Sequence, residues 1–282
     1  MILSTRTNEG MGWRPDLPDY RDERFLFSRA LADEMLAPTV LPPSAQPQRR
    51  ELNKHPPRDQ GNAGSCVGHG VGLIAAVERN VTQRSPLFIY AEARKVIGEL
   101  EQDNGAFIRD GVKVVATLGA PKERDWPYDL SKLHDDPSDK ADRDAAKRKV
   151  FSYHRLQTGQ EFRSCLASGH LFAIGFTVYS LMWEPLVTEH GIVNMPYGTA
   201  QGGHCVAVIG YDNVFRQSEW AFEARQRGIP DASIPEQVYE CQNSWSASWG
   251  RQGRFVIDAR YLEHWALAGD AWTLRGFEDE WR

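Results

Sequence analysis

Four polar side chains spread along this sequence are of the types that acyl transfer requires: Gln60, Cys66, His204 and Asn243. A thiol is a nucleophile, an imidazole is a base, one amide can orient that base, and a second amide can bind an oxyanion. Each of the four lies within two residues of a glycine or a tryptophan. The set predicts nucleophilic catalysis at a carbonyl carbon.

Cys66 is the predicted nucleophile. It follows Gly64-Ser65 and opens a stretch with apolar residues at helical spacing, so we expect it at the N-terminus of a buried helix. The unpaired N–H groups and the dipole at such a terminus favour the thiolate, which predicts a lowered pKa. The alternative, a small buried hydrophobe, is our interpretation of Cys165, Cys205 and Cys241.

His204 is the predicted base. It follows Gly202-Gly203 at the start of a predicted strand. Glycines there allow close approach of a substrate, so Gly203 is placed among the substrate-binding residues. His69 lies one helical turn from Cys66, but two side chains on one helix rarely reach the geometry of a thiolate–imidazolium pair. His69 is therefore predicted to be a core or supporting residue.

Two amides complete the predicted site. Asn243 can accept a hydrogen bond from the imidazole and fix its orientation. Trp245 can shield that hydrogen bond from water, and we place it with the substrate-binding residues. Gln60, together with the backbone N–H of Cys66, is the predicted oxyanion donor.

The composition is that of a soluble globular protein. The 282 residues carry a formal net charge of -5, with 41% hydrophobic and 25% charged residues. The mild negative charge argues against nucleic-acid binding, and no apolar run is long enough to span a membrane. No C-x-x-C motif is present, and the predicted chemistry requires no metal and no organic cofactor.

The cellular location is predicted from the N-terminus and the cysteines. Residues 1–6 lack the apolar core of a secretory signal, which predicts a cytoplasmic protein and leaves signal-independent export open. The four cysteines show no paired framework, which favours a reducing compartment.

The order of elements predicts an α+β fold with two lobes and a site in the cleft between them. Helices are expected first and strands second. The expected helices lie at 66–77, 86–100 and 108–118, the expected strands at 171–179, 205–211, 237–242 and 253–258, and an inserted helical stretch at 215–230. We divide the chain into an N-terminal extension (1–50), a helical lobe with the nucleophile (51–165) and a β-rich lobe with the histidine and asparagine (166–282).

The N-terminal extension carries many apolar side chains for a free tail. Trp13, Tyr20 and Phe25 lie among prolines, a short helix is expected at 22–36, and a proline-rich connector at 38–48. We expect residues 1–37 to dock either across the cleft as an inhibitory prosegment or beside it as a brace. The brace is slightly favoured, because no single cleavage site stands out.

The sequence resembles the papain-like cysteine peptidases over roughly residues 51–275. Gln60, Cys66, His204 and Asn243 fall on the oxyanion glutamine and catalytic triad of that family, and Asn243-Ser244-Trp245 resembles its Asn-Ser-Trp block. The resemblance implies a papain-like two-lobe fold: a central helix from Cys66 in the helical lobe and an antiparallel, β-barrel-like second lobe.

The resemblance also implies a substrate-binding loop and a specificity pocket. Asn104-Gly105-Ala106-Phe107-Ile108 resembles the loop that pairs with the substrate backbone. The pocket for the residue before the scissile one is expected to be apolar, with no charged wall and a hydrophobic preference. The predicted substrate-binding residues are Gly105, Ala106, Phe107, Ile108, Gly175, Gly203, Cys205 and Trp245.

Three positions depart from the family pattern. Ala63 replaces a cysteine, so the usual disulfide cannot form; Val67 replaces an aromatic residue; and Ala106 replaces the second glycine of the substrate loop. None of these changes removes a predicted catalytic atom.

The predicted function is a thiol endopeptidase that acts on peptide or protein substrates through an acyl-enzyme. One alternative is an amidase, deamidase or transpeptidase on the same site, because these share the acyl-enzyme and differ in acceptor and pocket. The other is a catalytically silent binding module, which the complete set of four polar residues disfavours.

Overall fold

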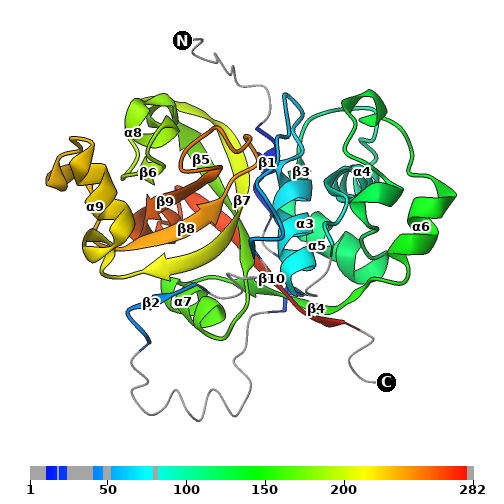
Figure 1. Cartoon of the computed structure of the whole chain (residues 1–282). Coiled ribbons are helices and arrows are strands. Elements are labelled where there is room, and N and C mark those ends of the chain that lie inside the picture. The colour runs from blue at the N-terminus through cyan, green and yellow to red at the C-terminus, as the bar shows by residue number, and fades with distance from the viewer. Residues whose placement is uncertain (1–10, 18, 24–40, 47–51, 79–81, 278–282) are drawn as a thin grey trace.

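The computed structural model describes residues 11–17, 19–23, 41–46, 52–78 and 82–277. Within these ranges no helix is long and apolar enough to cross a membrane. The helix expected at 22–36 falls almost entirely outside the described residues. Figure 1 shows the helices between Cys66 and Ala145 on one side of the molecule and the main sheet, with further helices beside it, on the other.

The helical lobe is built around α3 (Cys66–Glu78), with α4 (Pro86–Val96), α5 (Ile108–Thr117) and α6 (Asp139–Ala145). Small residues let α3 be buried on several sides, as predicted. A Cβ at Gly68 would lie 2.2 Å from the carbonyl oxygen of Pro86, and a Cβ at Gly111 of α5 would lie 2.9 Å from Val67 Cγ1. The close contacts around α3 therefore depend on glycine.

The β-rich lobe contains one large sheet with the strand order β4-β10-β5-β7-β8-β9-β6. Adjacent strands are antiparallel except for the pair β6–β9, and β2 (Ser44–Ala45) adds to β7. The strands are β4 (Val150–Leu156), β5 (Phe172–Tyr179), β6 (Ile192–Val193), β7 (Ala200–Asp212), β8 (Val238–Gln242), β9 (Arg254–Asp258) and β10 (Ala268–Phe277). Short helices flank the sheet: α7 (Gly159–Ala167), α8 (Pro185–Thr188), α9 (Glu219–Gln226) and α10 (Ala259–Glu263).

The α+β arrangement of a helical and a β-rich lobe is confirmed, and all four expected strands are present. Four strands of this sheet were not expected: the longer strands β4 and β10 and the two-residue strands β2 and β6. The sheet takes in β4 from Val150 onwards, ahead of the boundary predicted at 165/166, and β2 joins it from the N-terminal extension. The inserted stretch 215–230 is helical as expected, since α9 packs with Phe215 and Ile192 in a small apolar cluster of its own.

A second, two-stranded sheet lies between the lobes. It pairs β1 (Trp13–Arg14) in parallel with β3 (Ala106–Phe107). Figure 1 shows β1 between β7 of the sheet and α3 of the helical lobe. The N-terminal segment thus lies where the two lobes meet.

Candidate active site

Cys66 is the first residue of α3, as expected, and its side chain is fully buried. Burial raises the pKa of the Cys66 thiol to about 11, although hydrogen bonds from the backbone of Cys205 and Gly12 oppose the rise. The lowered pKa expected at a helix N-terminus is therefore not found in this form. Desolvation outweighs the helix dipole, because the chain itself covers the thiol.

His204 and Asn243 form a buried hydrogen-bonded pair. The distance from His204 Nε2 to Asn243 Oδ1 is 2.8 Å, and Asn243 Oδ1 also accepts from the backbone nitrogen of Ser244 at 2.8 Å. The second contact fixes the amide orientation, so the oxygen faces the ring and Nε2 donates. This leaves Nδ1 as the ring nitrogen that can take up a proton.

Aromatic rings enclose this pair. The ring of Trp245 stacks on His204 at 4.4 Å, and Phe176 contacts the imidazole edge-on at 5.9 Å. Trp245 in turn stacks on Trp183 at 5.2 Å and meets Trp249 edge-on at 5.1 Å. Water is excluded from the hydrogen bond, as expected for Trp245, while the contribution of Trp183 was not recognised in the sequence.

Gln60 lies beneath the nucleophile loop with its side chain fully buried. Its Nε2 donates to the carbonyl oxygen of Ala63 at 2.8 Å, and its Oε1 accepts from the hydroxyl of Ser244 at 2.5 Å. The backbone nitrogen of Gln60 also donates to the carbonyl oxygen of Ser244 at 2.8 Å. These contacts hold the amide in one orientation, as an oxyanion donor requires.

His69 is a core residue, in agreement with the sequence prediction. Its Nδ1 lies 3.1 Å from the carbonyl oxygen of Ser65, and its ring packs edge-on against Tyr128 at 4.7 Å. Burial lowers the pKa of His69 to about 3, so the imidazole is neutral at physiological pH.

Asp103 ties the nucleophile loop to the predicted substrate loop. Its Oδ1 accepts from the backbone nitrogen of Gly64 at 3.0 Å and from the hydroxyl of Tyr90. That hydroxyl accepts in turn from the backbone nitrogen of Gly105 at 3.1 Å. Sequence reasoning missed Asp103 and Tyr90, because nothing in their local sequence marks a link between two loops.

The N-terminal segment 11–17 passes directly through this site. The carbonyl oxygen of Gly12 accepts from the backbone nitrogen of Ala106 at 2.7 Å. A Cβ at Gly12 would lie 1.8 Å from the carbonyl oxygen of Gly64, and a Cβ at Gly105 would lie 2.1 Å from the carbonyl oxygen of Gly12. The loop expected to bind substrate backbone is thus occupied by the chain's own segment, with no room for a side chain at Gly12.

Trp13 fills a pocket beside the nucleophile. A Cβ at Gly175 would lie 2.1 Å from Trp13 Cε2, and a Cβ at Gly203 would lie 2.9 Å from Trp13 Cε3. The indole Nε1 donates to Asp270 Oδ2 at 3.2 Å. The expectation of a pocket without a charged wall is therefore wrong, since the carboxylate of Asp270 lies at its end.

The other predicted pocket residues lie nearby in different settings. Phe107 is partly exposed, with the guanidinium of Arg14 4.7 Å above its ring. Ile108 is buried at the start of α5. Cys205 is buried against α3, where a Cβ at Gly70 would lie 3.0 Å from its Sγ. Their contacts with a substrate stay predictions.

A cluster of charged groups holds the segment beyond Trp13. The backbone nitrogen of Asp16 donates to Asp270 Oδ2 at 2.7 Å, and Asp16 Oδ2 accepts from Trp272 Nε1 at 3.0 Å. Arg155 bonds Asp270 Oδ1 at 2.8 Å and Asp22 Oδ2 at 2.9 Å. Burial raises the pKa of Asp16 to about 7, and the charge of Asp270 adds to the rise.

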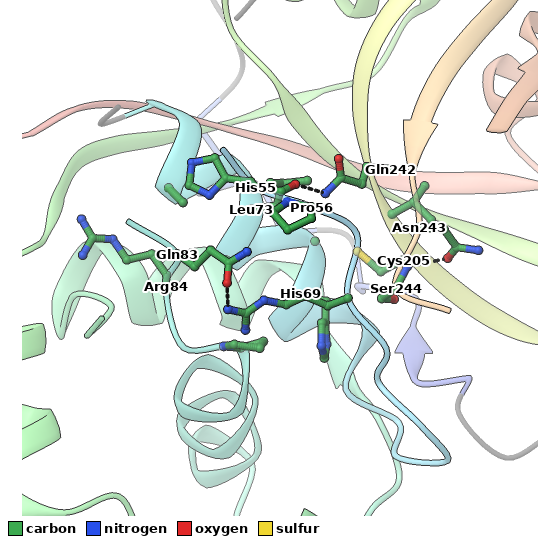
Figure 2. A pocket seen from close by; sticks show the side chains of 16 residues that line it. His55, Pro56, His69, Leu73, Gln83, Arg84, Cys205, Gln242, Asn243 and Ser244 are labelled. Atoms are coloured by element: carbon green, nitrogen blue, oxygen red, sulfur yellow. Dashed lines mark hydrogen bonds between the residues drawn. The ribbon is translucent and has the colours of Figure 1, made fainter. Parts of the chain in front are cut away.

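A separate cavity lies between the lobes, next to Asn243 and Cys205 (Figure 2). Its volume is about 40 Å³, and neither Cys66 nor the described part of the N-terminal segment lines it. Its polar groups bond one another: Arg58 donates to Gln83, and Gln242 Nε2 donates to the carbonyl oxygen of His55 at 2.9 Å. We therefore assign it to the interface between the lobes and not to substrate binding.

The four cysteines are buried and free of disulfides. In the part of the chain that the structure describes, no group of three or more histidine, cysteine, aspartate or glutamate residues is arranged to hold a metal ion.

The sequence and the fold match known proteins. A sequence model described as papain family cysteine protease matches residues 41–270. The crystal structure of xylellain, a cysteine protease from Xylella fastidiosa, is 28% identical, with a TM-score of 0.75 over 98% of this chain and 99% of that chain. An uncharacterized peptidase C1-like protein from Acanthamoeba polyphaga mimivirus is 28% identical over 238 residues, 78% of this chain and 70% of the relative. A procathepsin B from Trypanosoma congolense shares the fold at 14% identity, with a TM-score of 0.66 over 96% of this chain and 86% of that chain.

Proposed function

The chain belongs to the papain family of cysteine proteases, and on that premise we propose that it is a thiol endopeptidase whose nucleophile is Cys66. Once the segment has left, His204 takes up the proton of the Cys66 thiol. The thiolate attacks a peptide carbonyl, and the oxyanion is held by the Gln60 amide and the Cys66 backbone N–H. His204 protonates the leaving amine, and the acyl-enzyme forms. His204 then takes a proton from water, which attacks the acyl group and releases the product acid.

The observation that carries this proposal is the hydrogen bond between His204 Nε2 and Asn243 Oδ1. Both residues are buried, and the aromatic rings around them keep water away. This arrangement fixes the tautomer and the plane of the imidazole, which a base of this type requires.

We further propose that the N-terminal segment keeps the enzyme latent. In support, the Gly12 carbonyl oxygen accepts from the backbone nitrogen of Ala106, so this oxygen is engaged by the predicted substrate loop. The buried position of Cys66 beneath the segment supports the inhibitory role over the brace that the sequence slightly favoured.

The amidase, deamidase and transpeptidase alternatives use the same nucleophile. They predict different products, so a quenched-peptide library analysed by mass spectrometry distinguishes them. An endopeptidase gives two new peptides cut at an internal bond. An amidase or deamidase leaves the internal bonds intact and releases ammonia. A transpeptidase breaks an internal bond but transfers the acyl fragment to an added amine, so it yields an extended product in place of the free acid.

The same library tests the proposal itself. Because the docked segment keeps the full chain latent, the reference is Gly12→Ala, in which the segment is forced out of the cleft. It is compared with the same chain carrying Cys66→Ala, which retains the fold and loses the nucleophile. Internal cleavage that disappears in Cys66→Ala supports the proposal. Cleavage that persists in that variant, or a product pattern without internal cuts, contradicts it.

A further inference from the structure

We propose that Asp270 selects substrates by the residue that precedes the one carrying the scissile carbonyl. This preceding residue should have a bulky side chain that ends in a neutral hydrogen-bond donor, as tryptophan or tyrosine does. This inference rests on the proposed endopeptidase function and names the substrate class of its site. The observation behind it is the binding of Trp13, a side chain of that kind, which lies in the pocket and donates to Asp270.

The size of the pocket depends on two glycines, whose lack of a side chain leaves room for the indole. Gly175 of β5 and Gly203 of β7 both face the indole of Trp13, at distances that leave no room for a Cβ. β5 and β7 pair directly, with Gly175 opposite Cys205 and Thr177 opposite Gly203. Because both strands are central in the sheet, the space is fixed by the fold and not by a mobile loop.

The carboxylate of Asp270 closes the end of the pocket, and among the described residues outside the segment only one of its two oxygens has a hydrogen-bond partner. Arg155 bonds Asp270 Oδ1, while Oδ2 accepts from Trp13 Nε1 and from the backbone nitrogen of Asp16. Both of these Oδ2 donors belong to the segment. When the segment leaves, a substrate side chain that fills the pocket without a donor buries an unsatisfied carboxylate oxygen, which is costly.

The surrounding charges favour a neutral donor over a cation. Arg155 pairs with Asp270 directly, and Arg109 lies close enough to interact with its charge. Asp22 bonds both arginines, at 2.9 Å from Arg155 and 2.7 Å from Arg109, but it leaves with the segment. The open pocket then holds two guanidinium groups against one carboxylate, so a lysine or arginine side chain gains little there.

The first test uses peptides that differ at this one position: Trp, Tyr, Phe, Leu and Arg. The enzyme is the full chain with Gly12→Ala, which removes the segment from the cleft. We expect kcat/KM for Tyr to exceed that for Phe by about tenfold or more, because the two differ by the donor alone. Equal rates for Tyr and Phe, or a maximum for Arg, overturn the proposal.

Variants of the pocket provide the matched controls. Asp270→Ala, added to Gly12→Ala, should bring the Tyr to Phe ratio close to one while Leu is still cleaved. Gly175→Val should abolish cleavage of peptides with Trp or Tyr at this position and retain cleavage of peptides with a small side chain there. If the Tyr to Phe ratio survives Asp270→Ala, another acceptor is responsible and the assignment is wrong.

A second test needs no catalysis and so separates this inference from the proposed function. In the full chain, Trp13 is replaced by Tyr, Phe or Arg, and alkylation of Cys66 by iodoacetamide is followed by mass spectrometry. Trp13→Tyr should keep the thiol protected, whereas Trp13→Phe and Trp13→Arg should raise the alkylation rate by about tenfold. Equal protection by Phe or Arg contradicts the role of Asp270, even if no peptide is cleaved.

Discussion

The carbonyl oxygen of Gly12 lies 2.7 Å from the backbone nitrogen of Ala106, which places the chain's own N-terminal segment in the loop that resembles the family's substrate-binding loop. The pairing of β1 with β3 is parallel and only two residues long. Two such residues contribute little alone, so the docking depends on Trp13, Asp16 and Asp22, which are bonded to Asp270, Trp272 and the two arginines.

The first prediction concerns Gly12. Gly12→Ala places a Cβ 1.8 Å from the Gly64 carbonyl oxygen, so the segment is forced out of the cleft. We expect the rate of Cys66 labelling and of peptide cleavage to rise by about tenfold, from a steric cost of about 1–3 kcal/mol. Tyr20→Ala is the control, because Tyr20 lies on the same segment and is 98% exposed. Equal rates in Gly12→Ala and the original chain contradict the latent form.

The second prediction is a pH dependence of docking. The docked segment raises the pKa of Asp16 from 3.8 to about 7, mainly by burial and then through Asp270. The docked state therefore binds a proton that the released state has lost. The stabilisation of the docked state by this proton is complete below pH 3.8 and is lost as the pH rises through about 7. The segment should therefore leave the cleft more readily towards neutral pH.

Other groups face Asp16 and enter the same equilibrium: Asp270 and Trp272 on β10, Arg155 on β4, Arg109 on α5, and Cys205 on β7. Asp16→Asn isolates the effect, because it keeps the shape and removes the titration. The measurement is the alkylation rate of Cys66 from pH 5 to pH 8, as a ratio of the two proteins at each pH, which cancels the titration of the thiol itself. A ratio independent of pH refutes the role of Asp16.

The third prediction separates the roles of the triad. In Gly12→Ala, His204→Ala should lower kcat by about 10²–10⁴, because it removes the proton shuttle. Asn243→Ala should lower kcat by less, because it removes the orientation and leaves the shuttle. Full steady-state kinetics on one peptide provide the comparison. A larger loss in Asn243→Ala than in His204→Ala contradicts the assignment.

The fourth prediction concerns Trp245, which is 2% exposed and stacks on His204. Trp245→Ala should lower the free energy of unfolding by about 3–5 kcal/mol, through lost burial and a cavity. It should also lower kcat, since water then reaches the His204–Asn243 hydrogen bond. Trp265→Ala is the control, because Trp265 is 88% exposed and should change neither quantity. Unchanged kcat in Trp245→Ala shows that shielding is unimportant.

The sequence predicts the helical lobe and the pair His204 and Asn243 well, because each carries a local signal. The small residues of α3 indicate a buried helix, and glycine before His204 marks a close approach. β10 has no such signal. Its register shifts between Gly269 and Trp272, and Asp270 in this interval has a positive φ of 54°, so the alternation expected of a strand is broken.

Two features could not be predicted for a different reason: they depend on contacts between distant segments. The pKa of Cys66 is set by the chain that covers it, and the local helix terminus alone predicts the opposite direction. The acid in the pocket, Asp270, lies 257 residues from the indole that it binds. Neither the spacing of residues along the chain nor the composition shows that these distant segments come into contact.

The most direct test of the central claim is to label the chain with a peptide epoxide that reacts with thiolates, followed by peptide mapping. In Gly12→Ala we expect one adduct, on Cys66, formed faster than in the original chain and in step with the loss of peptidase activity. Cys66→Ala should take up no label and cleave no peptide. Modification of Cys165, Cys205 or Cys241 before Cys66, or full activity after Cys66 has been blocked, would contradict the account.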